Sequence, residues 1–423
     1  MTKLLNNNKF FSKRKQTPNQ KLLVTISILC LYRFCNTIPL SGIDNLALKE
    51  SFLQFEKNNS IVQILNMYSG GGGKTVLSPF SLGIIPFINA SILIDLLTTL
   101  LPFLEKLQSE EGETGRQTVL LYKKILTLLF AIIQSLGLLF SLRSFIYSTT
   151  WITYFFLTAQ LTAGAFSFIW LTNLIDKKGL GNGTSLIILV NILFSFFNRG
   201  SKLPIKFSSS LLFETSYLFI LIAIICISQT ARFTIPIVSA RQLVYLENLE
   251  NSHLDNLQKR FQKSENGLSI RLNQAGIFPI IIASNLLPFF SFFFQSFGNK
   301  ILATTFTTVC YYFFIVVFNY LYTIVFWDPE KIAEKLRKAS VSIKDVSPGS
   351  ETVSYLENTV RASSFYGGLF LCCILGSYEF VKPFTSGILL NQINISSLLI
   401  VTGVVYDTLT TFNSLNQIHR SER

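Results

Sequence analysis

The chain has 423 residues, of which 49% are hydrophobic and only 14% are charged, and its mean hydropathy is +0.45. Soluble domains carry about 25% charged residues, so this composition excludes an ordinary soluble domain and indicates a polytopic membrane protein. The net charge of +13 suggests nucleic-acid binding at first, but basic residues that gather on one side of a membrane explain it better.

Apolar segments long enough to cross a bilayer, or close to it, recur along the whole chain. The pattern predicts an all-α protein with ten membrane spans. They run approximately over 22–40, 82–102, 125–142, 151–175, 183–198, 211–229, 274–296, 302–326, 363–380 and 386–411.

The distribution of basic residues between the loops indicates the orientation of these spans in the membrane. With ten spans both termini lie on one side, and that side carries 26 Lys and Arg residues against nine on the other. Positive charge marks the cytoplasm-equivalent side of membrane proteins. We therefore expect a basic tail at 1–21 and a second tail at 412–423, both on that side.

Two loops on the basic side are longer than a simple connection needs. They cover 230–273 and 327–362, and connections of more than about 15 residues are usually functional or disordered. One interpretation is a solvated loop that touches anionic lipid headgroups. The other is a docking surface for a large partner.

The segment between the first two spans combines a short apolar stretch with a glycine run. Residues 61–68 are apolar but too short to cross a membrane, and Gly70 to Gly73 follow. Non-helical backbone at membrane depth survives only when it is buried in protein or lines a water-filled cavity. A re-entrant half-helix inside a pore and a flexible external linker both fit this pattern.

Residues that could support catalysis or bind a metal are scarce. The six cysteines lie in apolar runs with no CxxC, and His253 and His419 are in polar surroundings. We therefore expect no metal site, no cofactor and no catalytic role. A small-solute transporter would need ionisable residues near the membrane midplane, where Arg33 and Asp407 are the few candidates, and it remains the alternative function.

Seven strings, in order, carry a family resemblance. They are IPLSGID (38–44), LGIIPFINASI (82–92), EEGETGR (110–116), LTAGAF (161–166), GLGNGTS (179–185), NQAGIFPIIIAS (273–284) and SPGSET (347–352). Together they resemble the SecY family, the central subunits of the Sec protein-conducting channel, over almost the whole chain. The short amino-terminal tail and an amino-acid composition rich in Phe, Ile, Asn and Lys resemble those of the plastid-encoded members.

The resemblance implies two pseudo-symmetric five-helix halves, 22–198 and 211–411, around an hourglass pore. It also implies a re-entrant plug within 61–74 and a lateral gate between spans two and seven. The pore ring would be Ile84, Ile88, Thr184, Ile188, Ile281 and Ile400. The plug would include Leu65, Asn66, Met67, Tyr68, Ser69 and Gly70, and the gate would use Asn89, Gln134, Ser284 and Asn285.

The resemblance also implies partners. A SecA motor ATPase or a ribosome would dock on the long loops through Arg241, Lys344, Ser347, Pro348 and Gly349, and SecE and SecG-like subunits would bind beside the spans. Preproteins would be the substrate, and ribosomal RNA the only nucleic acid in contact. Thr184 stands where the family usually has a bulky aliphatic residue, and Ser347 where it often has Arg. The expected membrane is the thylakoid, with a bacterial plasma membrane as the alternative.

Overall fold

The computed structural model describes residues 17–47, 77–109, 112–200, 209–239, 267–271, 275–276, 278–284, 286, 300–343, 346–384 and 395–421. These residues belong to two compact units. The first comprises Met1–Phe87, Leu128–Phe197 and Val404–Arg423, and the second comprises Ile88–Thr127 and Asn198–Gly403. Helices α4, α6, α8 and α16 each contain residues of both units.

The helices follow the apolar segments of the sequence. Within the described residues, helices cover nine of the ten expected spans. The seventh is described at 275–276, which form a bend, and at 278–284 and 286, where it is helical. Among the residues that the structure describes, six helices are long and apolar enough to cross a membrane. The helices are α1 (Pro18–Cys35), α4 (Ile85–Leu100), α5 (Pro102–Ser109), α6 (Gly112–Ser141), α7 (Trp151–Lys178), α8 (Gly183–Gly200), α9 (Ser209–Thr230), α13 (Lys300–Phe326), α14 (Pro329–Lys338), α15 (Ser350–Val381) and α16 (Ile395–Ser421), with short 3-10 turns at Arg143–Phe145 and Lys382–Phe384.

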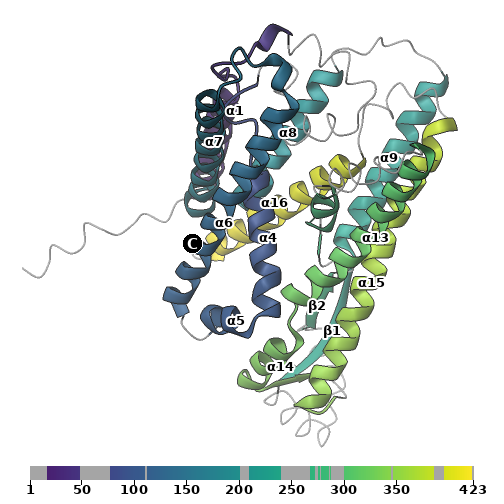
Figure 1. Ribbon diagram of the computed structural model, residues 1–423. Coiled ribbons are helices and arrows are strands. Elements are labelled where there is room, and N and C mark those ends of the chain that lie inside the picture. Colours follow the sequence, from purple (N-terminus) through teal and green to yellow (C-terminus); the bar gives the residue numbers. More distant parts are fainter. Residues whose placement is uncertain are drawn as a thin grey trace, which may run out of the picture. The chain divides into compact units, whose positions relative to one another are not determined.

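Packing in the first unit brings α1 against α7 (Figure 1). Its core is formed by buried aliphatic side chains from the segments that follow α1 and precede α4, and from α6 and α7. One glycine makes the tight packing possible. A β-carbon at Gly164 on α7 would overlap the carbonyl oxygen of Pro79, so only glycine lets the two backbones approach this closely.

The second unit contains a core between membrane helices, in which α13 packs along α15 (Figure 1). Its buried residues come from α9, α13, α15, α16 and the helical segment 278–284. A buried amide adds a polar link, because Asn319 on α13 donates a hydrogen bond to the carbonyl oxygen of Ser364 on α15. Such interhelical hydrogen bonds supplement van der Waals packing between membrane helices.

A three-stranded antiparallel sheet unites the two long loops, and it is an addition to the expected all-helical architecture. Strand β1 (Arg232–Ser239) pairs with β2 (Gly267–Arg271) from the same loop and with β3 (Val341–Ile343) from the other loop. Pro236, which has no N–H to donate, lies opposite Gly267 at the last pair with β2. From Ile237 onward β1 pairs with β3 instead.

This sheet has its own apolar core. Ile235, Ile270 and Ile343, one from each strand, are buried together with Leu356 of α15. Helix α14 covers the cluster with Ile332 and Leu336. We call β1, β2, β3 and α14 the sheet region.

Helices extend well beyond the expected spans at three places. Helix α6 begins at Gly112, ahead of the span expected from 125. Helix α15 begins at Ser350, so the last part of the expected loop 327–362 is helical, and α16 continues through the expected tail to Ser421. Adding residues to an existing helix is much easier than starting one. The polar residues there therefore continue the helices that the apolar spans establish.

Candidate pore and gate residues

The turn between α7 and α8 follows from the GLGNGTS string. Gly181 has φ +76, a left-handed conformation that favours glycine. β-Carbons at Gly179 and Gly183 would overlap the carbonyl oxygens of Ile175 and Thr172, respectively. The three glycines therefore let α8 start directly against the last turns of α7.

Two side chains cap the start of α8. The carboxylate of Asp176 accepts a hydrogen bond from the backbone N–H of Gly183 at 2.7 Å. Asn182 Oδ1 accepts from the backbone N–H of Thr184 at 3.0 Å and from the Thr184 hydroxyl at 2.6 Å. These contacts satisfy N–H groups that a helix start leaves without partners. The Thr184 hydroxyl, at a predicted ring position, is thus part of the turn.

Polar and aromatic contacts join α1 to α7 and α8. The Tyr32 hydroxyl donates to Asn191 Oδ1 at 2.6 Å, and both residues are buried. The Tyr32 ring also packs on Phe168 of α7, with ring centroids 4.5 Å apart. The guanidinium carbon of Arg33 lies 3.1 Å from the centroid of the Phe194 ring on α8. Arg33, a candidate for a transporter site, therefore packs against an aromatic ring.

Hydrogen bonds hold together the two ends of the segment that contains the predicted plug. The backbone N–H of Leu40 donates to the carbonyl oxygen of Leu77 at 2.7 Å, and the N–H of Leu77 donates to Asn45 Oδ1 at 3.1 Å. Asp44 caps the short turn that follows by accepting from the N–H groups of Leu46 and Ala47. The plug residues 65–70 lie outside the described residues.

A tight turn leads into α4 and fixes the first two ring positions. The hydroxyl of Ser81 bonds both the N–H and the carbonyl oxygen of Ser78, and Gly83 has φ +60. Pro86 is the second residue of α4, where a missing N–H costs no helical hydrogen bond. Ile84 precedes the helix and Ile88 lies one turn inside it.

Most of the predicted ring positions are buried. Five are isoleucines with exposed fractions between 1% and 6%, whereas Thr184 is half-buried. Ile84, Thr184 and Ile188 belong to the first unit, and Ile88, Ile281 and Ile400 belong to the second. Closure of one ring from these six side chains stays a prediction.

The predicted gate residues are described in part. Asn89 lies half-buried on α4, Gln134 half-buried on α6, and Ser284 buried at the end of the helical segment 278–284. The Ser284 hydroxyl donates to the carbonyl oxygen of Ile280 at 2.7 Å. Asn285 lies outside the described residues, and a polar cluster among the four stays a prediction.

An ion pair between α4 and α6 gives Asp95 a partner that the sequence did not reveal. Lys123 Nζ lies 2.7 Å from Asp95 Oδ1, and the side chains are 17% and 32% exposed, respectively. Both residues lie in the second unit. A charge pair that is 28 positions apart becomes visible only when the helices are placed, which is why no sequence pattern predicted it.

Three of the expected docking residues are described, and all three lie in the second loop. Ser347, Pro348 and Gly349 are exposed and lead into α15, and the Ser347 hydroxyl donates to the carboxylate of Glu351 in its first turn. Ser347 therefore bonds to a side chain in the first turn of α15 instead of offering a cation. Arg241 and Lys344 lie outside the described residues.

Comparison with known proteins agrees with this description. The SecY family model matches residues 78–409. A protein translocase subunit SecY from Vaucheria litorea is 33% identical over 96% of this chain and 98% of its own length. SecY of Pyropia yezoensis is 34% identical over 93% and 95%, and SecY of Synechocystis is 32% identical over 92% and 90%.

Solved structures share the fold. A protein-conducting channel aligns with a TM-score of 0.61 at 14% identity, covering 95% of this chain and 93% of that one. Sec61 in the canine ribosome-channel complex from the endoplasmic reticulum aligns with a TM-score of 0.57 at 15% identity, covering 96% and 94%. The family match and the full-length relatives together place the chain: it belongs to the SecY family of protein translocase subunits.

Proposed function

We propose that this multi-pass membrane protein forms the pore of a Sec translocase, through which unfolded preproteins cross the membrane. Hydrophobic segments of the same substrates leave sideways through a gate between α4 and the helix that contains residues 278–284. None of the relatives and structures reported above is a solute transporter, so nothing favours that alternative.

The observation that carries the proposal is the burial of the five predicted ring isoleucines. They come from four separate stretches of the chain and are at most 6% exposed. Many other apolar side chains on the same helices are open, for example Leu93, at 38%. Branched aliphatic side chains at a constriction exclude water and ions yet present a neutral, deformable surface to a passing chain.

The direct test removes side-chain volume from the ring. Proteoliposomes that contain the translocase with Ile88→Gly and Ile188→Gly should conduct ions at rest, whereas the wild-type complex should not. The measurement is the membrane current, or the decay of an imposed potassium gradient, without any substrate.

A matched control separates the pore from general damage. Ile152 is an isoleucine on α7 that is 81% exposed, and Ile152→Gly should leave the resting membrane tight. Unchanged conductance in the double ring variant, with the protein present and folded, would refute the pore assignment.

We further propose that residues 61–74, within the segment between Ala47 and Leu77, act as the plug. Support comes from two hydrogen bonds at the base of this segment, which hold its two ends together. One joins Leu40 to Leu77 and the other joins Leu77 to Asn45. Asn45→Ala removes one of these bonds and should increase spontaneous opening. The readout is resting conductance, with Asn19→Ala at the start of α1 as control, and an identical current for both variants would count against a plug with this base.

Partners and compartment complete the proposal. The sheet region gives a motor ATPase or a ribosome a folded surface on the basic side of the membrane, and SecE and SecG-like subunits would bind beside the spans. Relatives in algae and a cyanobacterium support a thylakoid location. Mass spectrometry of the complex, purified from separated thylakoid and envelope membranes, would identify the partners, and recovery only from the envelope would contradict the location.

A further inference from the structure

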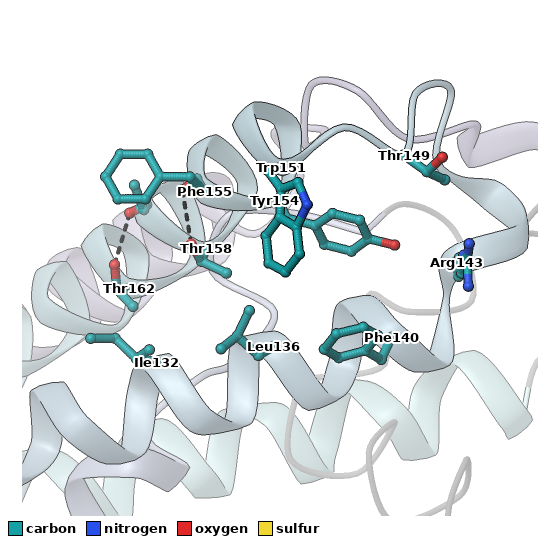
Figure 2. A pocket seen from close by; sticks show the side chains of 11 residues that line it. Ile132, Leu136, Phe140, Arg143, Thr149, Trp151, Tyr154, Phe155, Thr158 and Thr162 are labelled. Atoms are coloured by element: carbon teal, nitrogen blue, oxygen red, sulfur yellow. Dashed lines mark hydrogen bonds between the residues drawn. The ribbon is translucent and has the colours of Figure 1, made fainter.

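A groove between α6 and α7 in the first unit has features of a built ligand site (Figure 2). Its volume is about 600 Å³, within the range of pockets that bind small organic ligands. Its walls come from Ile132, Leu136, Phe140, Arg143, Thr149, Trp151, Tyr154, Phe155, Thr158, Ala159 and Thr162.

Most of the groove is apolar, including the part lined by threonines. The hydroxyl of Thr158 donates to the carbonyl oxygen of Phe155, and that of Thr162 donates to the carbonyl oxygen of Ala159 (Figure 2). Because these hydroxyls are bound to their own helix, the methyl groups remain for contact. Together with Ile132 and Leu136 they form a surface suited to a hydrocarbon chain.

One end of the groove is polar. Figure 2 shows Arg143 and Thr149 at this end, with the hydroxyl of Tyr154 directed toward it. The Tyr154 ring is stacked on Phe140 of α6, with centroids 5.7 Å apart. Among the residues that the structure describes, no carboxylate pairs with the exposed Arg143 guanidinium.

The polar end coincides with a membrane surface. The candidate spans end at Phe140 and begin again at Trp151, so Arg143 lies in the connection just outside both. Trp and Tyr are typical of this interface, where their apolar rings meet the lipid and their polar groups meet the headgroups. Arg143 is also one of only nine basic residues on the face that is poor in them.

We propose that this groove binds one anionic diacyl lipid, with an acyl chain along Ile132, Leu136 and Thr158 and its headgroup phosphate on Arg143. A guanidinium offers a fork of donors that fits such an anion. A zwitterionic lipid would fill the apolar part equally well but would gain less at Arg143. Charge selectivity therefore distinguishes a site from ordinary contact with the bilayer.

The test measures quenching of Trp151 by brominated lipid. The translocase, with Trp170→Phe and Trp327→Phe in this chain and no tryptophan in the partner subunits, is reconstituted in phosphatidylcholine vesicles. These contain the same fraction of either brominated phosphatidylglycerol or brominated phosphatidylcholine. We expect about a fivefold preference for the anionic lipid, since one basic residue near a membrane surface contributes about 1 kcal/mol.

Two charge variants locate the preference. Arg143→Gln should abolish it, whereas Lys178→Gln should keep it, because Lys178 is an exposed cation at the end of α7 that lies farthest from Trp151. Equal quenching by both lipids in the parent protein would overturn the proposal, leaving a general lipid contact. Absence of quenching by either lipid would overturn it too, since a partner protein would then cover the groove.

A second measurement does not depend on the tryptophan variants. The translocase containing the otherwise unaltered chain, purified in mild detergent, should retain more phosphatidylglycerol per protein than the complex with Arg143→Gln, as counted by mass spectrometry of the extracted lipid. Equal retention would contradict the site.

Discussion

The α7–α8 turn and the sheet region both connect membrane helices, yet different interactions determine them. The turn is local: Asp176, Asn182 and three glycines, all within eight residues, decide its path. The sheet region is non-local, because β1 pairs with a strand that begins about 100 residues later. The comparison shows that a local motif fixes a turn, whereas the sheet forms only when strands far apart in the sequence pair with one another.

The largest expected effect is in the sheet region. Ile235 is completely buried between Ile270 and Ile343, and Ile235→Ala should cost about 3 kcal/mol of that region's stability, as a cavity in a packed core does. Hydrogen exchange should then accelerate in β1, β2 and β3 but not in α7 or α8. Phe233→Ala, on the same strand but 59% exposed, is the control, and equal acceleration in α8 would show that the two regions are not independent.

The local turn should be sensitive to a single methyl group. Gly183→Ala places a β-carbon against the backbone of Thr172 and should cost about 2 kcal/mol through overpacking, measured by thermal unfolding in detergent. Gly137→Ala on α6, where the new methyl meets nothing within 4 Å, should cost nothing. If both variants unfold at the same temperature, the turn does not require its glycine.

The cap of α8 should contribute less. Asp176→Asn removes a charge-assisted acceptor for the Gly183 N–H and should cost about 1.5 kcal/mol. The same denaturation assay measures it, with Asn173→Ala, an exposed residue one turn earlier on α7, as control. Full stability of Asp176→Asn would assign the turn to the glycines alone.

The smallest effect concerns the start of α14. Asp328 accepts hydrogen bonds from the N–H groups of Glu330 and Lys331, and Asp328→Ala should cost about 1 kcal/mol. Protease cleavage within α14 should increase, while cleavage near the α7–α8 turn should not. Asp328→Ser keeps a capping oxygen and should restore resistance, and a failure to do so would rule out capping as the cause.

Structure that depends on residues close together in the sequence was predictable, whereas contacts between residues on separate helices were not. The spans followed from apolar runs. The path of the turn within the string GLGNGTS is also a local property, because glycine conformations and caps depend on near neighbours. The Asp95–Lys123 pair and the bond from Tyr32 to Asn191 join separate helices. Their residues are compatible with many partners, so the sequence alone did not choose among them.

The sequence by itself determined that the chain crosses a membrane many times and which family it resembles. These properties depend on composition, hydropathy and short motifs, whose free energies are largely set by the solvent and by adjacent residues. Only the tertiary structure decided that the two long loops join in one sheet, that Asp95 has a basic partner, and that Arg143 closes an apolar groove. Each of these three features depends on residues that are far apart in the sequence and are brought together by packing. Their contacts contribute free energy only once the elements that carry them are packed together.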